Sequence, residues 1–593
     1  MSFLFLIAVA VLGEGNDIQL WLPGTQPGQT TEPETVQRCQ FCHPQQVKEW
    51  TGSMMAHAPR APMFNALLAL TTKYTITRGF ATPEYGLRCH SPSAWLAGRS
   101  HELSVQSLFG TDLDGVHCDF CHRSVDPMQP ESTAIVGGTV PGYGNGMYVV
   151  QRNGQPVRGA RGGLPEHCEA TKADSFYRTS EYCGVCHEVS NPYFSQSPRV
   201  NPPYKQIQME RTYSEWKLSW FSSGEGKRTC QSCHMPTSPG VSSISPTARQ
   251  RPDIASHEFS GGNTLGPYMV GQHWDGMDQQ ALRDGMTRAA SFLKTAARLE
   301  VVAGRTEHNV VALVRLTNLT GHKLPTGFPE GRRMWINVVG KDKRGAIVFE
   351  SGHYDPASGM LHEDGQLKVY EAQSGRTAGL AATLGMPSGH SFLGGLNDTM
   401  LFDNRIPPRG FTNSAFLDRN APPIGYHYED GQYWDVSEYT LPVSTYSVDV
   451  NVYYQLVSDE FARFLRDENI GNPYDWNQWG EKVYEMWQRR GAPTLMARQS
   501  ASVLSRPPKL STFQDFDVAV QFSLAQNYPN PFNSETTIEY WVSNGTHAVL
   551  ELYDLRGQLV RTLVDGIVST GLLTTRVDAS GLPSGVYFYR LSV

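Results

Sequence analysis

Four short segments of the chain have the pattern Cys-x-x-Cys-His, at residues 39–43, 118–122, 183–187 and 230–234. In this pattern two thiols can add to the vinyl groups of one haem, and the histidine that follows reaches the iron. Only 18 of the 593 residues are histidine, so a histidine directly after one of the ten cysteines is expected less than once by chance, yet it occurs five times. The pattern therefore predicts covalently bound haem c. The predicted attachment residues are Cys39, Cys42, Cys118, Cys121, Cys183, Cys186, Cys230 and Cys233, and the predicted proximal ligands are His43, His122, His187 and His234.

Other uses of paired cysteines fit this spacing less well. Zinc sites also use Cys-x-x-Cys, but they give no role to a histidine that directly follows every pair. A thioredoxin-like redox motif occurs once, in a βαβ context that is missing here. A disulfide framework is expected in a smaller chain.

The fifth Cys-His pair, Cys89–His90, lacks a first cysteine, because Gly86 stands in its place. Cys89 can form a single thioether, with His90 as the proximal ligand. Alternatively, Cys89 pairs with Cys168 in a disulfide and this haem is lost, or Cys168 supplies the second thioether from a distance. One covalent bond together with histidine ligation is chemically sufficient to hold the macrocycle.

From about residue 36 to at least residue 333 the chain resembles the multihaem c-type cytochromes. The residues that carry the resemblance are CQFCHPQQVKEWTGSMMAHA, GLRCHSPSAWLAGR, DGVHCDFCHR, EYCGVCHEV, CQSCHMP, HEFSGGN and GHKLPTGFPEGRR. The resemblance implies bis-histidine haems and electron transfer without substrate chemistry. In that family the second segment normally begins with cysteine, so Gly86 is a departure. Because SPSAWLAGR still matches the haem-binding segment, five haems are expected, one with a single thioether at Cys89, and four is the alternative.

A six-coordinate iron needs a second ligand, and eight histidines between residues 39 and 333 lie outside the Cys-His pairs. They are His57, His101, His117, His167, His257, His273, His308 and His322. By resemblance, His57, His257 and His322 are distal ligands. His167 is added because it precedes the 183–187 motif, a common family location, and His117 is a further candidate. Met54, Met55 and Met235 are alternative ligands.

The sequence pattern predicts an α+β protein with several domains. Residues 36–298 hold all ten cysteines, with helical spacing at 45–70, 212–221 and 278–298, and are expected to form a mostly helical and irregular domain packed around haem. Residues 299–499 alternate in NVVALVRLTNL, RMWINVVG and STYSVDVNVYYQLV, which predicts a β-sandwich with a helical tail. Residues 500–517 are polar and contain proline, as in a linker. Residues 518–593 have short strands typical of a small all-β, Ig-like module.

This last module resembles the type IX secretion C-terminal sorting domain. The matching residues are LAQNYPNPFN, LYDLRGQLVRTL and SGLPSGVYFYRL. The resemblance implies the type IX secretion machinery as a partner and transport across an outer membrane. Removal of the module and attachment or release at the cell surface would follow.

The N-terminus and the overall charge bear on location. Residues 3–12 form an uninterrupted apolar run, too short to span a bilayer, so residues 1–13 are expected to be a signal peptide. No other stretch approaches a membrane span. A net charge of −7 gives no electrostatic reason to expect nucleic acid or an anionic membrane as a partner. An exported protein without a transmembrane span in its mature form is expected, in the periplasm during transit and then outside the cell.

Four or five haems within about 230 residues must lie close together, which is what electron hopping requires. The expected function is therefore an electron carrier, not an enzyme, that exchanges electrons with a redox partner protein or an extracellular acceptor. One alternative is a multihaem oxidoreductase that acts on a small nitrogen compound at an open-coordination haem, although no Cys-x-x-Cys-Lys variant is present. Another alternative gives the main role to the predicted β-sandwich of residues 299–499, which would bind a mineral, a polymer or a neighbouring subunit, as in a homo-oligomer or a haem filament.

Overall fold

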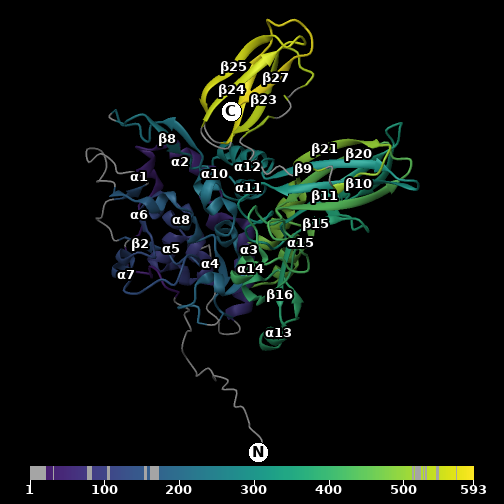
Figure 1. Cartoon of the computed structure of the whole chain (residues 1–593). Coiled ribbons are helices and arrows are strands. Elements are labelled where there is room, and N and C mark those ends of the chain that lie inside the picture. Colours follow the sequence, from purple (N-terminus) through teal and green to yellow (C-terminus); the bar gives the residue numbers. More distant parts are fainter. Residues whose placement is uncertain are drawn as a thin grey trace, which may run out of the picture.

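The computed structural model of the chain is a mixed α+β, multidomain structure (Figure 1). It describes residues 22–30, 32–76, 83–102, 107–151, 157–159, 172–195, 197–246, 248–510, 513, 522–524, 527, 530–542, 546–568 and 571–593. The expected signal peptide, His167 and Cys168 lie outside the described residues. Short helices lie on one side of the molecule, a large sheet on the other, and the C-terminal module apart from both.

Proline starts many of the short helices in the cysteine-rich part, where its missing N–H has no helical partner to lose. The helices are α1 (Val36–Gln40), α2 (Pro44–Thr51), α3 (Pro62–Ile76), α4 (Pro83–His90), α5 (Pro92–Ala97), α6 (Cys118–Arg123), α7 (Pro130–Val136), α8 (Ser180–Gly184), α9 (Thr212–Lys217), α10 (Cys230–His234), α11 (Gly266–His273) and α12 (Gln279–Leu293). The helical pattern at 45–70 is thus two helices, because α2 ends at Gly52 and α3 restarts at Pro62.

Strands in the same part form small two-stranded sheets. The pairs are β1 (Ser124–Val125) with β2 (Val149–Val150), β3 (Arg158–Gly159) with β4 (Lys172–Ala173), β5 (Val189–Asn191) with β6 (Ile207–Glu210), and β7 (Thr237–Gly240) with β8 (Arg251–Ala255).

The middle of the chain forms a large sheet with the order β12-β11-β20-β21-β9-β10-β19, and β15 pairs with β11. The strands are β9 (Ala297–Arg305), β10 (Asn309–Asn318), β11 (Arg333–Lys341), β12 (Ile347–Ser351), β15 (Lys368–Tyr370), β19 (Trp434–Pro442), β20 (Ser447–Gln455) and β21 (Thr494–Leu504). Only two residue pairs join β21 to β9, in parallel. β21 also extends five residues into the stretch 500–517 that was expected to be a linker.

Smaller elements complete this part. They are β13 (Tyr354–Asp355), β14 (Met360–Leu361), β16 (Ala372–Arg376), β17 (Gly389–His390), β18 (Thr399–Asp403), α13 (Ala378–Leu384), α14 (Asn413–Asp418), α15 (Asp459–Asn469) and α16 (Trp479–Arg490).

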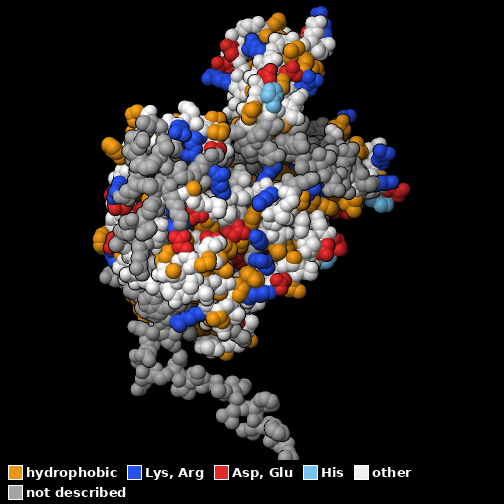
Figure 2. Space-filling view, turned by 60° about the vertical axis from the view of Figure 1, so that its left-hand side comes forward, with side chains coloured by type: hydrophobic (Ala, Val, Ile, Leu, Met, Phe, Trp, Pro, Cys, Tyr) orange, Lys and Arg blue, Asp and Glu red, His pale blue; other side chains and the backbone are white. Residues whose placement is uncertain are grey.

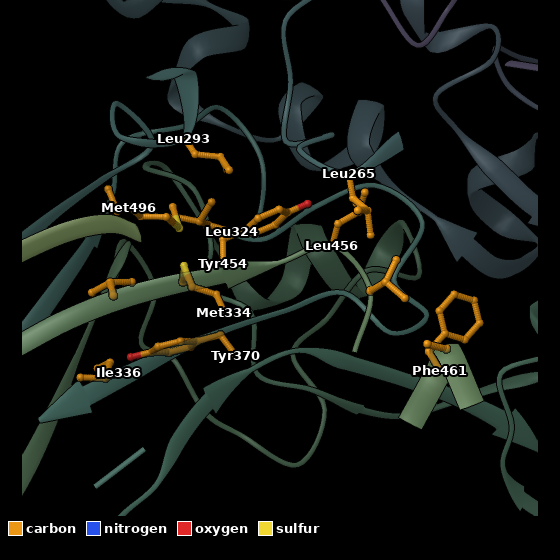
Figure 3. Close-up of a cluster of buried hydrophobic side chains, with 14 of the residues drawn as sticks. Leu265, Leu293, Leu324, Met334, Ile336, Tyr370, Tyr454, Leu456, Phe461 and Met496 are labelled. Carbon is orange, nitrogen blue, oxygen red and sulfur yellow. The ribbon is translucent and has the colours of Figure 1, made fainter. Parts of the chain in front are cut away.

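The large sheet and the helical part share one hydrophobic core. Leu293 of α12 packs in the same cluster as Met334 of β11, Tyr454 of β20 and Met496 of β21 (Figure 3). Helix α3 joins the same core and contacts α15, where the Asn469 side-chain amide donates to the Ala66 carbonyl oxygen at 3.2 Å. The sheet is therefore fixed against the cysteine-rich part.

The C-terminal module has a core of its own, formed by Ile538, Tyr540, Val542, Ala548, Leu550, Val577 and Leu591. Its strands are β22 (Phe522–Leu524), β23 (Glu535–Val542), β24 (Thr546–Tyr553), β25 (Leu559–Val568), β26 (Gly571–Asp578) and β27 (Phe588–Ser592). They form two three-stranded sheets, β22-β23-β26 and β25-β24-β27. The module is thus a small, separate all-β unit.

Two surface properties bear on location. Within the described ranges, no helix is long and apolar enough to cross a membrane. Acidic and basic side chains are interspersed over the face shown in Figure 2.

Candidate haem centre

Each Cys-x-x-Cys-His segment forms a helical turn that brings its three reactive side chains to one face. In the first motif the His43 N–H donates to the Cys39 carbonyl oxygen at 2.8 Å, and α6 and α10 contain the second and fourth motifs. Side chains at i, i+3 and i+4 of such a turn are neighbours. Helix α4 gives Gly86, Cys89 and His90 the same relation, so the incomplete site keeps the backbone of a complete one.

All of these turns open into one continuous cavity of about 2710 Å³. Ordinary single-ligand pockets measure about 300–1,000 Å³, so this cavity has room for several large groups. It is lined by Cys39, Cys42, Cys89, Cys118, Cys121, Cys183, Cys186, Cys230 and Cys233, and by His43, His90, His117, His122, His187, His234, His257 and His322. A cysteine- and histidine-lined cavity of this size fits a set of covalent haems.

Four of the five proximal-type imidazoles are oriented by a backbone carbonyl oxygen that accepts from Nδ1. The pairs are His43 with Ser242 at 2.5 Å, His90 with Ala58 at 3.2 Å, His122 with Arg158 at 2.6 Å and His234 with Ser260 at 2.6 Å. A histidine that donates from Nδ1 in this way offers the lone pair of Nε2 to a metal.

Burial keeps three of these rings, His90, His122 and His234, neutral, which is the form that binds a metal. It lowers the pKa of His90 and of His234 to about 4, and it also lowers the pKa of His122.

His187 has a different partner, because its Nδ1 faces the Glu210 carboxylate oxygen Oε1 at 3.5 Å. Burial acts to lower the pKa of His187, but the nearby carboxylate outweighs it and the net direction is upward. Burial acts to raise the pKa of Glu210, whereas His187 and Arg332 lower it, and the net direction is downward.

His234 and His322 face each other across the cavity. Their ring centroids lie 6.5 Å apart and their planes differ by 25°. Two imidazole nitrogens that share one metal ion stand about 4 Å apart, because each bond is about 2.0–2.1 Å long. The observed spacing therefore has room for one metal ion between the rings. The His322 Nδ1 donates to the Lys323 carbonyl oxygen at 3.0 Å, which leaves Nε2 for the cavity.

His257 lies close to the first two motifs. Burial lowers its pKa to about 4, and the charges of His122 and His43 contribute to this shift. Its Nδ1 donates to the Ala255 carbonyl oxygen at 3.1 Å, so its Nε2 is also available.

His57 and His117 use their other ring nitrogen for hydrogen bonding. The His57 Nε2 donates to the Thr51 carbonyl oxygen at 2.9 Å, and the His117 Nε2 lies 2.9 Å from Ser93 Oγ. In both rings Nδ1 is buried and has no hydrogen-bond partner. Such orphaned nitrogens are rare and need a partner, which a metal would provide. His117 lines the cavity, whereas His167 lies outside the described residues.

At the incomplete motif, a phenyl ring occupies the space beside Gly86. A Cβ atom on Gly86 would lie 3.1 Å from Phe64 Cε2, and the Phe64 ring stacks on His90 with centroids 3.8 Å apart. The Cys89 thiol is free and contacts the Cys186 thiol. Its predicted alternative partner, Cys168, is not among the described residues, so the disulfide stays an open alternative.

Thiols of different motifs contact one another in three pairs, Cys39 with Cys118, Cys89 with Cys186 and Cys183 with Cys230. A hydrogen bond joins the 118–122 motif to the residue before the 183–187 motif: the Tyr182 hydroxyl donates to the Cys121 carbonyl oxygen at 3.1 Å. The five sites therefore adjoin one another.

A buried cluster of four charges, which the sequence does not reveal, holds the loop that carries His322. The Lys323 ammonium lies 2.7 Å from Asp403 Oδ2, and Arg405 contacts both Asp403 at 2.6 Å and Glu215 of α9 at 3.2 Å. The Lys323 backbone N–H also donates to Glu215 Oε2 at 3.1 Å. The two acidic and two basic groups balance, so the cluster joins α9 to the His322 loop and the end of β18 without net charge.

One further carboxyl in the cavity wall was also not predicted. Glu330 is 3% exposed, its Oε1 accepts from Ser374 Oγ at 2.5 Å, and its Oε2 has no hydrogen-bond partner. Burial raises its pKa to about 8, so it is protonated near neutral pH.

Comparison with known families supports the haem chemistry of this site. Residues 38–123, which contain two complete motifs and the Cys89–His90 pair, match the family of cytochrome c554 and c-prime. The chain therefore contains a segment similar to the c-type cytochromes. Residues 526–593 match the secretion system C-terminal sorting domain, which supports export to the cell surface or the medium and implies interaction with the secretion machinery.

Among solved structures, the chain is similar to a penta-heme cytochrome c552 from Thermochromatium tepidum. The two share 17% sequence identity with a TM-score of 0.48, over 79% of this chain and 99% of that chain. No curated protein matches the chain.

Proposed function

We propose that the chain is an exported electron carrier with five closely spaced haem c groups, one of them attached by a single thioether at Cys89. The observation that carries the proposal is the one continuous cavity into which all four complete motifs and the Cys89–His90 pair open. Bound haem supplies one-electron chemistry, and the chain supplies spacing, axial ligands and the surroundings that tune the potential.

His43, His90, His122, His187 and His234 serve as proximal ligands. His322 is the distal partner of His234, supported by the 6.5 Å between their ring centroids. His257 serves one of the first two complete motifs, and His117 and His57 ligate through the buried Nδ1 atoms that have no other partner. His167 completes the proposed set.

The contacts between thiols support an order for the sites. The 39–43 site adjoins the 118–122 site through Cys39 and Cys118. The 183–187 site is central, because Cys186 contacts Cys89 and Cys183 contacts Cys230. Electrons would enter and leave at the outer members of this branched row, by exchange with a redox partner protein or an extracellular acceptor.

Intact mass of the mature protein, combined with a pyridine haemochrome spectrum, tests the haem count. We expect the mass of five haems, and loss of one haem mass in the Cys89→Ser variant. A Cys118→Ser, Cys121→Ser variant is the control, since it removes a complete motif and should also lose one haem. A wild-type mass of four haems with a Cys89–Cys168 disulfide would contradict the proposal.

A second candidate, an oxidoreductase with one open iron, is favoured by a specific observation. Among the described residues, the cavity-lining histidines outside the Cys-His pairs are His117, His257 and His322, fewer than the five proximal ones. Carbon monoxide or nitrite added to the reduced protein distinguishes the two functions. A perturbed spectrum favours the enzyme, and an unchanged, fully low-spin spectrum favours the carrier.

A further inference from the structure

The five proximal-type histidines differ in what accepts their Nδ1 hydrogen bond. For His43, His90, His122 and His234 it is a neutral backbone carbonyl, whereas for His187 it is the carboxylate of Glu210 at 3.5 Å. This difference is specific to the central site of the proposed row.

The β5–β6 hairpin places Glu210 beside His187. His187 lies two residues before β5, and the register of the hairpin sets Glu210 opposite Val189. The buried Arg211 fixes the hairpin by donating to the Val189 carbonyl oxygen at 2.9 Å. The Thr212 hydroxyl donates to Glu210 Oε1 at 3.2 Å, so the carboxylate is held in one position.

A carboxylate that accepts from a metal-bound imidazole makes the ring a stronger electron donor. A stronger donor stabilises the ferric state relative to the ferrous state and lowers the reduction potential. The Glu210 side chain is 14% exposed, so water screens its charge only weakly.

We propose that Glu210 is a positioning residue that acts through His187 to make this central haem the hardest of the set to reduce. The inference rests on the proposed function, since it takes His187 as an iron ligand. An electron that passes between the haems on either side of the central site then has to enter a haem of lower potential, which is an energetically unfavourable step.

A redox titration of the purified, haem-loaded protein tests this inference. Glu210→Gln keeps the size and hydrogen-bonding capacity of the side chain but removes its charge. We expect the lowest midpoint potential to rise by at least a tenfold change in the reduction equilibrium, which is about 59 mV for one electron. The other midpoint potentials are expected to keep their values.

Glu181→Gln is the matched control. Glu181 lies two residues before Cys183, but its carboxylate accepts from Tyr213 and Lys217 and not from a histidine ring. Removing the charge of Glu181 should shift the lowest midpoint potential by less than Glu210→Gln does. A Glu210→Gln shift no larger than the control shift would overturn the proposal, because it would then reflect general charge only.

Thr212→Val provides an independent variant with the opposite sign. It removes the hydroxyl that shares Glu210 Oε1, so His187 becomes the main partner of that oxygen and the potential should fall. A rise or no change would contradict the proposal even if Glu210→Gln does not fold. Loss of one haem mass in a Cys183→Ser, Cys186→Ser variant tests haem attachment at this site separately. An unchanged mass would refute the assignment of the site, not the tuning by Glu210.

Discussion

The buried charge cluster between α9, the His322 loop and the end of β18 gives the sharpest stability prediction. In Asp403→Asn, one of two negative charges is lost, and Lys323 and Arg405 are left with an excess positive charge. Asp403, Lys323 and Arg405 are at most 4% exposed, so water cannot compensate for the loss. Removing one partner of a buried ion pair lowers the free energy of unfolding by about 3–5 kcal/mol.

The expected shift in melting temperature follows from the size of the domain. For about 150–250 residues, 1 kcal/mol corresponds to about 2–4 °C, so Asp403→Asn should melt at least about 6 °C lower. The assay is thermal unfolding of the haem-loaded protein, followed by circular dichroism.

Asp449→Asn is the control, because it is the same substitution in another strand, β20, at a more exposed pair. Asp449 lies 2.6 Å from Lys341, and the two side chains are 26% and 36% exposed. Exposed pairs contribute about 0–1 kcal/mol, so the control should lose at most about 4 °C. Equal shifts in both variants would refute the idea that the buried cluster holds β18 and the His322 loop to α9.

Three further predictions concern the cavity. His322→Ala should convert one haem per chain to a high-spin, carbon-monoxide-binding form without changing the haem mass. His308→Ala is the control, because that side chain is 90% exposed, and it should produce no such haem. A fully low-spin His322→Ala protein would contradict the assignment of His322 as a ligand. Glu330 has a pKa of about 8, above its ordinary value of about 4.3, so its contribution to stability is present at low pH and lost as pH rises through 8. Glu330→Gln should flatten the fall in unfolding free energy between about pH 4.3 and pH 8, and denaturant titrations that keep the slope would count against it. Gly86→Cys should convert the Cys89 site to two thioethers after a small shift of Phe64, visible in the pyridine haemochrome spectrum; a thiol that still reacts with an alkylating reagent would argue against this.

Local patterns in the sequence predicted a large part of this structure. The strand expected at 309–319 is β10 (Asn309–Asn318), because alternating apolar residues need one buried face. The linker expected from residue 500 begins later, since β21 has one exposed face and reads as polar up to Leu504. Such strands are determined largely by residues that are close together in the chain, so their pattern can be recognised in a single sequence.

Contacts between distant segments could not be predicted in the same way. Glu210 meets His187 only through the register of a short hairpin, and nothing about a lone glutamate 23 residues after the motif signals it. Lys323 and Asp403 are 80 positions apart and meet where the two segments pair through Leu324 and Ile406. Their roles depend on tertiary packing, which leaves no local pattern.

The core shared by the helices and the large sheet has a consequence for the order of assembly. Leu293 and Met334 lie in one cluster, and His322 follows every cysteine motif in the chain. Haem that enters a cavity shared by the helices and the His322 loop has to reach its thiols from outside, so we expect attachment to begin before β10 and β11 fold against α12. Because those strands follow all the motifs in the chain, synthesis from the N-terminus itself leaves an interval for haem attachment before the sheet folds.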